Sequence, residues 1–594
     1  MNIRLLSNRA AAYLKMENFS AAEQDCRAVL AVDSSHSKCR YRMALALLLQ
    51  QRPVEAMIYM DYVTTADLLD TKTLSEKEMK AVQREQTCAQ IMQEDIKRAI
   101  SETRGVYNMK ELMHESKTEA GISKKHMNYE SPLIRLQNNI PKKGRGFIAT
   151  TSIPAGQLVI ASKAFVMAPA MDSMAGMTTM TTEFSAHSNM YSTGAQLLPI
   201  VIRQLILHPE MGRELYSLTA GSSYTTEPVI EEHYDRVDLK RLSGILKSNC
   251  FTTYTDNLRK FIDAPVGTNK LAEEDCSSST LAGRGLWIKP SFFNHSCLPN
   301  CDYTVIGDFM FIVTNRTIAE GDELTVSYCD VRESFPERRE IFDRWNETEG
   351  FTCMCSRCEF DRTHPEVVAA EATVQSAYKQ GVELCSQGMD MGRAADQIMP
   401  PVQRKALLCL LEKQPLEGKR VLCELYDIIT MSHLTASRLK EALASVKQCI
   451  EVELVLFGVS SPGSPFLLRA EFRLITILLA LRIDCMSEIK KVFNRVCCPP
   501  SGLYSRVEFL TLSKRYIAVN NYDQFCAMVQ LLDDTKANCI DGVAGCGGGS
   551  GGSSSSGSSS GSSSSSSVSS SPNNNNNANN SKKNTTRKGR KGKK

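Results

Sequence analysis

The stretch that decides the fold runs from residue 284 to residue 328 and reads RGLWIKPSFFNHSCLPNCDYTVIGDFMFIVTNRTIAEGDELTVSY. It contains Asn294-His295-Ser296-Cys297, then alternating apolar segments, and then Gly321-Asp322-Glu323-Leu324 shortly before Ser327-Tyr328. A further motif, Cys353-x-Cys355-x-x-Cys358, follows downstream. Any one of these motifs alone is a weak signal, but several of them in this order are improbable by chance.

Strand patterns extend on the N-terminal side of this stretch. Residues 133–166 alternate in strand fashion around two turn signals, Lys143-Gly144-Arg145-Gly146 and Pro154-Ala155-Gly156. Residues 286–293, which are mostly apolar, predict a buried strand that leads into the Asn-His pair. We therefore expect a β-rich region with hairpins here.

Together these motifs resemble the C-terminal half of a SET domain and its post-SET zinc site, as found in the SET-MYND group of protein lysine methyltransferases. The resemblance implies an α+β protein in which a β-rich SET fold is flanked by helical regions at both ends. It places a SET domain at residues 133–352, with an insert at about 167–245, and a post-SET zinc loop at residues 353–362.

The same resemblance implies a binding site for S-adenosyl-L-methionine. In the family the glycine-rich hairpin supplies backbone to the methionine end of the cofactor, and the Asn-His pair fixes the cofactor by hydrogen bonds. Tyr328 is the residue expected to act in catalysis, by orienting the lysine amine and polarising the sulfonium. The full set of expected cofactor contacts is Lys143, Gly144, Arg145, Asn249, Asn294, His295 and Phe351.

A zinc site is expected next to this cofactor site. Cys353, Cys355 and Cys358 cannot close a tetrahedral site without a fourth ligand. The family supplies Cys297 as that ligand, and Cys301 is its local competitor. Four thiolates leave no open position for water, so the zinc is expected to be structural.

Two departures from the family pattern stand out. Relatives usually carry an aromatic residue two positions before Phe351, whereas this chain carries Glu349, with Trp345 as the nearest aromatic substitute. A MYND finger needs some seven or eight Cys and His ligands in the family, yet there is no cysteine between Phe147 and Cys250. We therefore expect the MYND finger to be absent.

The N-terminal residues 1–70 predict tetratricopeptide repeats, because small and apolar residues recur at helical spacing over two helix pairs. Asn8, Lys38 and Arg42 align with a carboxylate clamp that binds chaperone tails in some of these repeats. The alternative is a solvated concave face, which we favour because the earlier clamp residues have no counterpart here.

The rest of the chain divides by composition. Residues 71–132 predict a helical linker, and residues 363–541 predict successive amphipathic helices, with Ala442, Val446 and Cys449 on one face. Residues 542–594 are rich in Gly, Ser and Asn and end in a basic run, which predicts disorder. The basic end is either a nuclear-import or nucleic-acid-contacting tail or a solubilising end.

Composition limits the compartment and the partners. The net charge is +4, and eight Lys and Arg residues after Asp541 more than account for it, so the remainder is slightly acidic and unlike a DNA-coating surface. The 21 scattered cysteines indicate free thiols in a reducing compartment. No signal core and no apolar run of about 20 residues is present. We expect a soluble protein of the nucleus or cytoplasm.

The leading hypothesis is a lysine N-methyltransferase acting on a histone or non-histone protein. One rival is a non-catalytic scaffold that keeps the SET fold for its shape, which Glu349 favours. The other rival is a SET enzyme that methylates another side chain, such as histidine.

Overall fold

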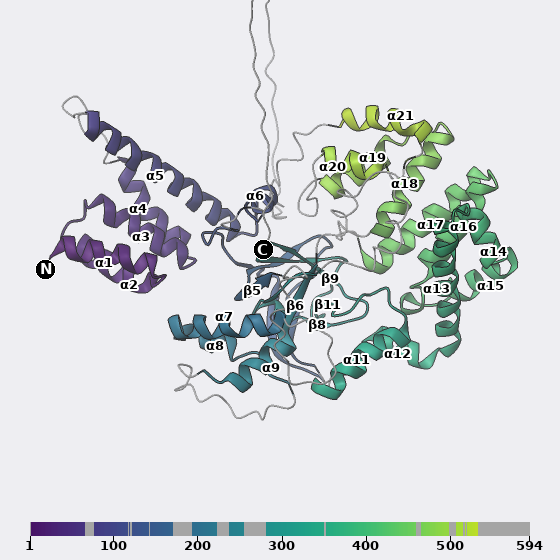
Figure 1. Cartoon of the computed structure of the whole chain (residues 1–594), viewed down its shortest axis with the longest axis horizontal. Coiled ribbons are helices and arrows are strands. Elements are labelled where there is room, and N and C mark those ends of the chain that lie inside the picture. Colours follow the sequence, from purple (N-terminus) through teal and green to yellow (C-terminus); the bar gives the residue numbers. More distant parts are fainter. Residues whose placement is uncertain are drawn as a thin grey trace, which may run out of the picture. The chain divides into compact units, whose positions relative to one another are not determined.

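The computed structural model describes residues 2–65, 76–116, 118, 121–141, 143–169, 193–221, 237–254, 281–349, 352–458, 465–497, 506–514, 517 and 519–532. All of them belong to one compact unit, Met1–Gly542. Small β-sheets lie in sequence between an N-terminal and a C-terminal helical region (Figure 1). The predicted α+β class is therefore confirmed. No helix among the described residues is long and apolar enough to cross a membrane.

The described part of the N-terminal region consists of six helices, and the first five pack in succession, each against the next. They are α1 (Ile3–Lys15), α2 (Phe19–Leu30), α3 (Ser37–Leu49), α4 (Pro53–Thr65), α5 (Glu76–Glu102) and α6 (Met109–Glu115). Ala10 and Ala22 are fully buried, which allows α1 and α2 to approach closely. Helix pairs of this kind are what tetratricopeptide repeats require, and the repeat assignment stays a prediction.

A buried polar contact ties the end of α5 to the segment just before β1 (Tyr129–Glu130). The Glu102 carboxylate accepts the Met127 N–H at 2.8 Å and lies 2.5 Å from Nδ1 of His126. Glu102 and His126 are both almost completely buried. Because a buried carboxylate is costly unless it is paired, this contact specifies where the helical linker meets the β-rich region.

The described residues of the β-rich region form four small sheets. Their strands are β1 (Tyr129–Glu130), β2 (Ile134–Ile140), β3 (Gly144–Ala149), β4 (Leu158–Lys163), β5 (Val166–Pro169), β6 (Cys250–Tyr254), β7 (Leu281–Leu286), β8 (Asn294–His295), β9 (Cys301–Ile306), β10 (Phe309–Thr314) and β11 (Thr325–Val326). The sheets are β1-β4-β10-β9, β2-β3, β5-β7-β6 and β8-β11. Only the β8-β11 pair is parallel among these described strands, with Asn294 opposite Thr325 and His295 opposite Val326.

Both predicted turns in residues 133–166 are present. The first joins β2 to β3, and Gly144 there has a φ of 76° that side-chain-bearing residues rarely adopt. The second lies between β3 and β4, where Gly156 has a φ of 81°. The predicted strand at residues 286–293 is wrong. Strand β7 ends at Leu286, and Pro290–Phe292 forms a 3-10 helix, because proline lacks an N–H and has a φ suited to the first turn of a helix.

After β5, the regular elements described in the insert are helices, as are those of the C-terminal region. The insert contains α7 (Thr193–Leu207), η3 (Pro209–Met211), α8 (Gly212–Leu215) and α9 (Leu239–Asn249). The C-terminal region contains α11 (Phe335–Glu349), α12 (Ser356–Thr363), α13 (Pro365–Ser386), α14 (Met391–Ile398), α15 (Pro401–Leu411), η7 (Leu416–Gly418), α16 (Leu422–Thr435), α17 (Leu439–Phe457), α18 (Pro465–Ala480), α19 (Met486–Cys497), α20 (Arg506–Ser513) and α21 (Val519–Gln530).

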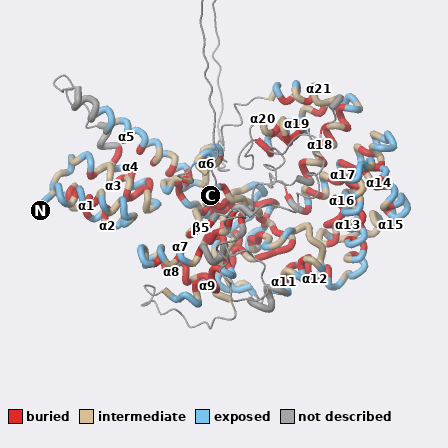
Figure 2. Tube along the Cα trace, viewed as in Figure 1, coloured by how far each residue is buried: buried red, intermediate tan, exposed pale blue. Residues whose placement is uncertain are grey.

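The predicted apolar face of residues 442–449 is confirmed, since Ala442, Val446 and Cys449 are all buried in the core of the C-terminal helices. Figure 2 shows buried positions recurring between exposed ones along the helices of both helical regions. Helix α17 ends at Gly458, which has a φ of 75°. The C-terminal region thus has a core of its own.

A buried ion pair joins α11 to α12. The guanidinium of Arg338 donates to the Asp361 carboxylate, and the two side chains are 0% and 1% exposed. Replacing Arg338 with methionine should lower the free energy of unfolding by about 3–5 kcal/mol, because the buried carboxylate loses its partner. The Arg338→Met, Asp361→Leu double variant should recover much of this loss. Urea unfolding followed by circular dichroism measures both, and a single variant as stable as the parent contradicts the expectation.

Candidate active site and metal centre

The glycine-rich hairpin and β8 are joined by a chain of polar contacts. Asn294 Nδ2 donates to the Arg145 carbonyl at 2.9 Å and to Glu323 Oε1 at 2.8 Å. Glu323 Oε2 in turn lies 2.6 Å from Lys143 Nζ. Lys143 and Glu323 are 180 positions apart in sequence. The structure therefore brings Lys143, Arg145 and Asn294 together through Glu323.

Gly146 makes this close approach possible. A Cβ atom at this position would lie 2.6 Å from Asn294 Nδ2 and 3.0 Å from Glu323 Oε1. Both distances are shorter than normal contacts, so any larger residue would displace the Asn294 amide. The hairpin thus uses Gly144 for its turn and Gly146 for its contact with β8.

Tyr328 follows β11 and is held at both ends. Its hydroxyl donates to the Phe293 carbonyl at 2.7 Å, and its backbone N–H donates to Nδ1 of His295 at 2.9 Å. The atoms packed around the hydroxyl raise its pKa above the ordinary value, so the phenol is neutral near pH 7. Tyr328 is nevertheless 38% exposed, which leaves part of the residue accessible to a ligand.

His295 lies beside Tyr328 and is almost completely buried. Burial lowers the pKa of its imidazole to about 4, so the ring is neutral near pH 7. Its Nε2 atom lies 3.2 Å from the sulfur of Cys297. One short segment therefore places Asn294 at the hairpin, His295 at Tyr328 and Cys297 at the cysteine cluster.

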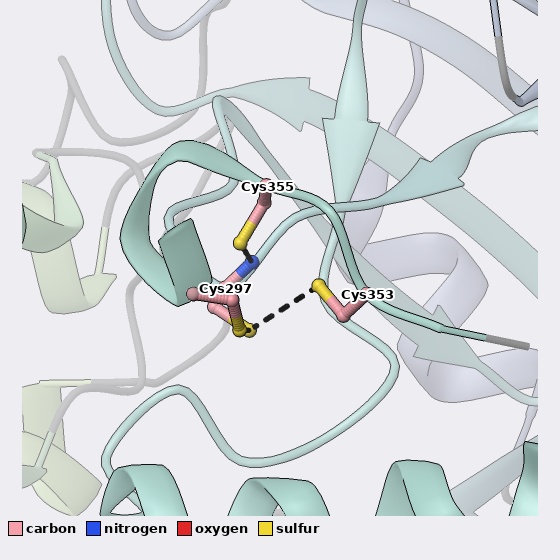
Figure 3. A group of neighbouring side chains, drawn as sticks. Cys297, Cys353 and Cys355 are labelled. Atoms are coloured by element: carbon pink, nitrogen blue, oxygen red, sulfur yellow. Dashed lines mark hydrogen bonds between the residues drawn. The ribbon is translucent and has the colours of Figure 1, made fainter. Parts of the chain in front are cut away.

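The four cysteines expected as zinc ligands lie together. Figure 3 shows three of them, Cys297, Cys353 and Cys355. Their sulfurs are all within 4.8 Å of one another, and all four residues are buried. The Cys297 sulfur lies 3.9 Å from that of Cys353 and 3.5 Å from that of Cys358. A tetrahedral zinc with Zn–S bonds of about 2.3 Å separates its sulfurs by about 3.8 Å, so this group has the right size and donor chemistry for zinc. Among the described residues, Cys301 lies on β9 and is not part of this group.

The side-chain amide of Asn249 is bonded elsewhere and not to Asn294 or the described residues of the hairpin. Asn249 Nδ2 donates to the carbonyls of Thr219 and Ile245, at 2.7 and 2.8 Å, and so holds the end of α9 against the segment that contains Thr219. Phe351 lies outside the described residues, and so do the side chains of Glu349 and Trp345. The expectations placed on these positions stay predictions.

The three residues of the suggested carboxylate clamp differ in their contacts. Asn8 and Lys38 are exposed. The Arg42 guanidinium instead donates to the carbonyl and hydroxyl oxygens of Ser7, at 2.7 and 2.5 Å. Arg42 is thus already used within the helical region.

Sequence reasoning missed two residues of the site. Glu323 was noted only as part of a motif, although it connects Lys143 to Asn294. Arg357, which is fully buried between two of the cysteines, donates to the carbonyls of Cys297 and Val331 at 3.3 and 2.7 Å. A charged residue inside a cysteine motif was a signal for a buried contact, but its partners are distant in sequence.

Comparisons with known proteins agree with this geometry. The family model of the SET domain matches residues 144–329. A SET and MYND domain-containing protein of Dictyostelium discoideum is 38% identical over 95 residues, 15% of this chain and 17% of that protein. The histone-lysine N-methyltransferase SMYD3 of Mus musculus is 28% identical over 116 residues, 18% of this chain and 26% of that protein. A methyltransferase of Gibberella zeae is 24% identical over 304 residues, 50% of this chain and 39% of that protein. The chain thus matches less than half the length of each of these relatives.

Proposed function

This chain is a SET-domain protein related to the SET-MYND methyltransferases, and we propose that it methylates a lysine side chain of a protein substrate. The main observation behind this proposal is that three segments of the matched SET region contact one another: the hairpin, the Asn294-His295 segment and Tyr328. The relative named as a histone-lysine N-methyltransferase supports lysine as the acceptor. The substrate is a histone or another protein.

S-adenosylmethionine, which the SET family implies, supplies an electrophilic methyl group on a sulfonium. The hairpin residues Gly144 and Arg145 offer backbone groups, and Lys143 is held beside them by Glu323. Asn249, Asn294, His295 and Phe351 complete the proposed contacts through the family resemblance. The hydrogen bond from Asn294 to the Arg145 carbonyl holds the two proposed cofactor-binding segments next to each other.

Tyr328 is the proposed catalytic residue. Its hydroxyl donates to the Phe293 carbonyl, and a hydroxyl that donates one hydrogen bond can still accept another. We propose that its oxygen accepts a hydrogen bond from the substrate amine and so aims the nitrogen lone pair at the methyl carbon. Because its raised pKa keeps the phenol neutral, Tyr328 orients the amine and does not remove its proton.

The four cysteines are proposed to hold a structural zinc. Cys297 belongs to the segment of the Asn-His pair, whereas Cys353 and Cys355 precede α12 and Cys358 lies within it. Zinc bound to four thiolates has no open position for a water nucleophile. Its proposed role is to hold the segment after the SET domain against the segment that carries Asn294 and His295.

Calorimetric titration of the zinc-replete protein with S-adenosylmethionine tests the cofactor site. We expect saturable binding that Asn294→Ala weakens about tenfold or more, because each hydrogen bond lost is worth about 0.5–1.5 kcal/mol and the Glu323 carboxylate loses a donor. Asn8→Ala, on the exposed face of α1, is the matched control and should bind as the parent does. If the parent protein is folded but shows no saturable binding, the result supports the rival hypothesis of a non-catalytic scaffold, which Glu349 favours.

The acceptor residue is tested separately. The protein is incubated with candidate substrates, beginning with histones, and S-adenosylmethionine that carries a deuterated methyl group. Fragmentation mass spectrometry then locates the label. Label on lysine supports the proposal, whereas label on histidine or another side chain identifies the rival SET enzyme.

A further inference from the structure

The ring of His295 makes two contacts that determine its tautomer. The backbone N–H of Tyr328 can only donate, and it points at Nδ1 from 2.9 Å. Nδ1 must therefore carry the lone pair, which leaves Nε2 as the nitrogen that bears the ring proton. Nε2 lies 3.2 Å from the Cys297 sulfur, so its N–H donates to that sulfur.

The ring has little freedom to leave this position. His295 is 5% exposed, and its ring centroid lies 5.2 Å from that of Tyr328 and 5.1 Å from that of Phe342. The backbone on both sides is paired, since His295 lies opposite Val326 and the Ser296 N–H donates to the Val326 carbonyl at 3.0 Å. The imidazole is thus a short rigid link between the Cys297 sulfur and the Tyr328 backbone.

We propose that His295 is a positioning residue that couples the zinc-binding cysteines to Tyr328 through this single tautomer. The family resemblance assigns His295 to the cofactor, and the link adds a separate role for its ring. A hydrogen bond to a metal ligand orients that ligand and tunes its donation to the metal. At the other end, Nδ1 holds the backbone that presents the Tyr328 hydroxyl to Phe293.

The role in catalysis rests on the proposed function, whereas the link itself does not. When zinc is removed, Cys297 is no longer held by the metal, and the anchor for Nε2 is weakened. The Tyr328 N–H should then exchange with solvent faster, because its acceptor Nδ1 belongs to a ring whose other nitrogen has lost a firm anchor. Zinc retention and Tyr328 order are therefore expected to be coupled.

Three substitutions of His295 separate the two ends of the link. In His295→Asn, the side-chain oxygen takes the place of Nδ1 and accepts from Tyr328, but the amide is too short to reach Cys297. In His295→Gln, the amide nitrogen takes the place of Nε2 and donates to Cys297, but no acceptor faces Tyr328. His295→Phe keeps a ring in the packed site and removes both nitrogens.

Two measurements that do not depend on activity follow the two ends. Zinc transfer to the chelator 4-(2-pyridylazo)resorcinol reports on Cys297, and hydrogen exchange of the Tyr328 amide by mass spectrometry reports on Nδ1. His295→Asn should release zinc about tenfold faster or more and keep Tyr328 protected. His295→Gln should keep zinc and expose the Tyr328 amide to exchange. His295→Phe should show both defects.

The outcomes are distinct. Parent-like zinc release and exchange in His295→Phe would show that the site needs only a ring, and identical behaviour of the Asn and Gln variants would show that the two ends are not separate. Either result overturns the proposal. If the variants do not fold, nitrogen NMR of the histidine ring in the parent decides the question, because a proton on Nδ1 is incompatible with the link.

Activity distinguishes this inference from the proposed function. In an active parent enzyme, His295→Gln should lower kcat about tenfold or more with a smaller change in KM for the protein substrate, since Tyr328 is misplaced. The parent protein could instead be inactive and still show the predicted tautomer, faster zinc release in His295→Asn and faster Tyr328 exchange in His295→Gln. That outcome would rule out the proposed function and support the link.

Discussion

Replacing Tyr328 with phenylalanine should lower kcat about 10²–10³-fold, the usual effect of losing one well-placed hydrogen-bonding group at a reacting centre. The hydroxyl is held at the Phe293 carbonyl by its 2.7 Å bond, so its oxygen has a defined position for the substrate amine. Affinity for S-adenosylmethionine should change little, because the hydroxyl is proposed to contact the substrate amine. Steady-state kinetics and calorimetry measure the two effects.

Tyr107→Phe is the matched control for this prediction. The Tyr107 hydroxyl also donates to a backbone carbonyl, that of Met127, at 2.6 Å, and the residue is buried at the junction between the helical linker and the first strand. Both variants lose one hydrogen bond, so each should lose about 0.5–1.5 kcal/mol of stability. Only Tyr328→Phe should lose activity. A fully active Tyr328→Phe enzyme would remove Tyr328 from the catalytic assignment.

Replacing Cys355 with serine should abolish zinc binding and destabilise the segment after the SET domain. Structural zinc contributes about 10–16 kcal/mol of apparent binding free energy in small zinc peptides, and three thiolates cannot close the site. Cys297, Phe342 and the other cysteines form one buried cluster, and without zinc the cysteines of this cluster are no longer held together by a shared metal ion. Plasma mass spectrometry should find about one zinc per parent chain and almost none in the variant, which should also unfold at lower temperature.

Cys301→Ser is the control for the ligand set. Cys301 is as deeply buried as Cys297, but it belongs to β9 and lies outside the cysteine cluster. This variant is expected to lose some stability and to keep its zinc. Zinc retained by Cys355→Ser, or lost from Cys301→Ser with a normal fold, would overturn the ligand assignment.

Local patterns predicted the elements well where the backbone itself supplies the signal. The turn at Gly144 depends on a positive φ angle that glycine adopts without strain. The same local logic explains the one clear error. Pro290 interrupts residues 286–293, and its restricted backbone begins a 3-10 turn although the segment is apolar enough for a strand.

The sequence by itself determined the fold class, the order of the elements and the cysteine spacing of the metal centre, because backbone preference, periodicity and motif spacing act over a few residues. Only the tertiary structure decided that Glu323 joins Lys143 to Asn294, that Cys297 and not Cys301 completes the cysteine cluster, and that the His295 ring faces Tyr328 on one side. These contacts join residues far apart in the chain. Their geometry depends on how the small sheets pack, and a packed arrangement is a property of the whole core.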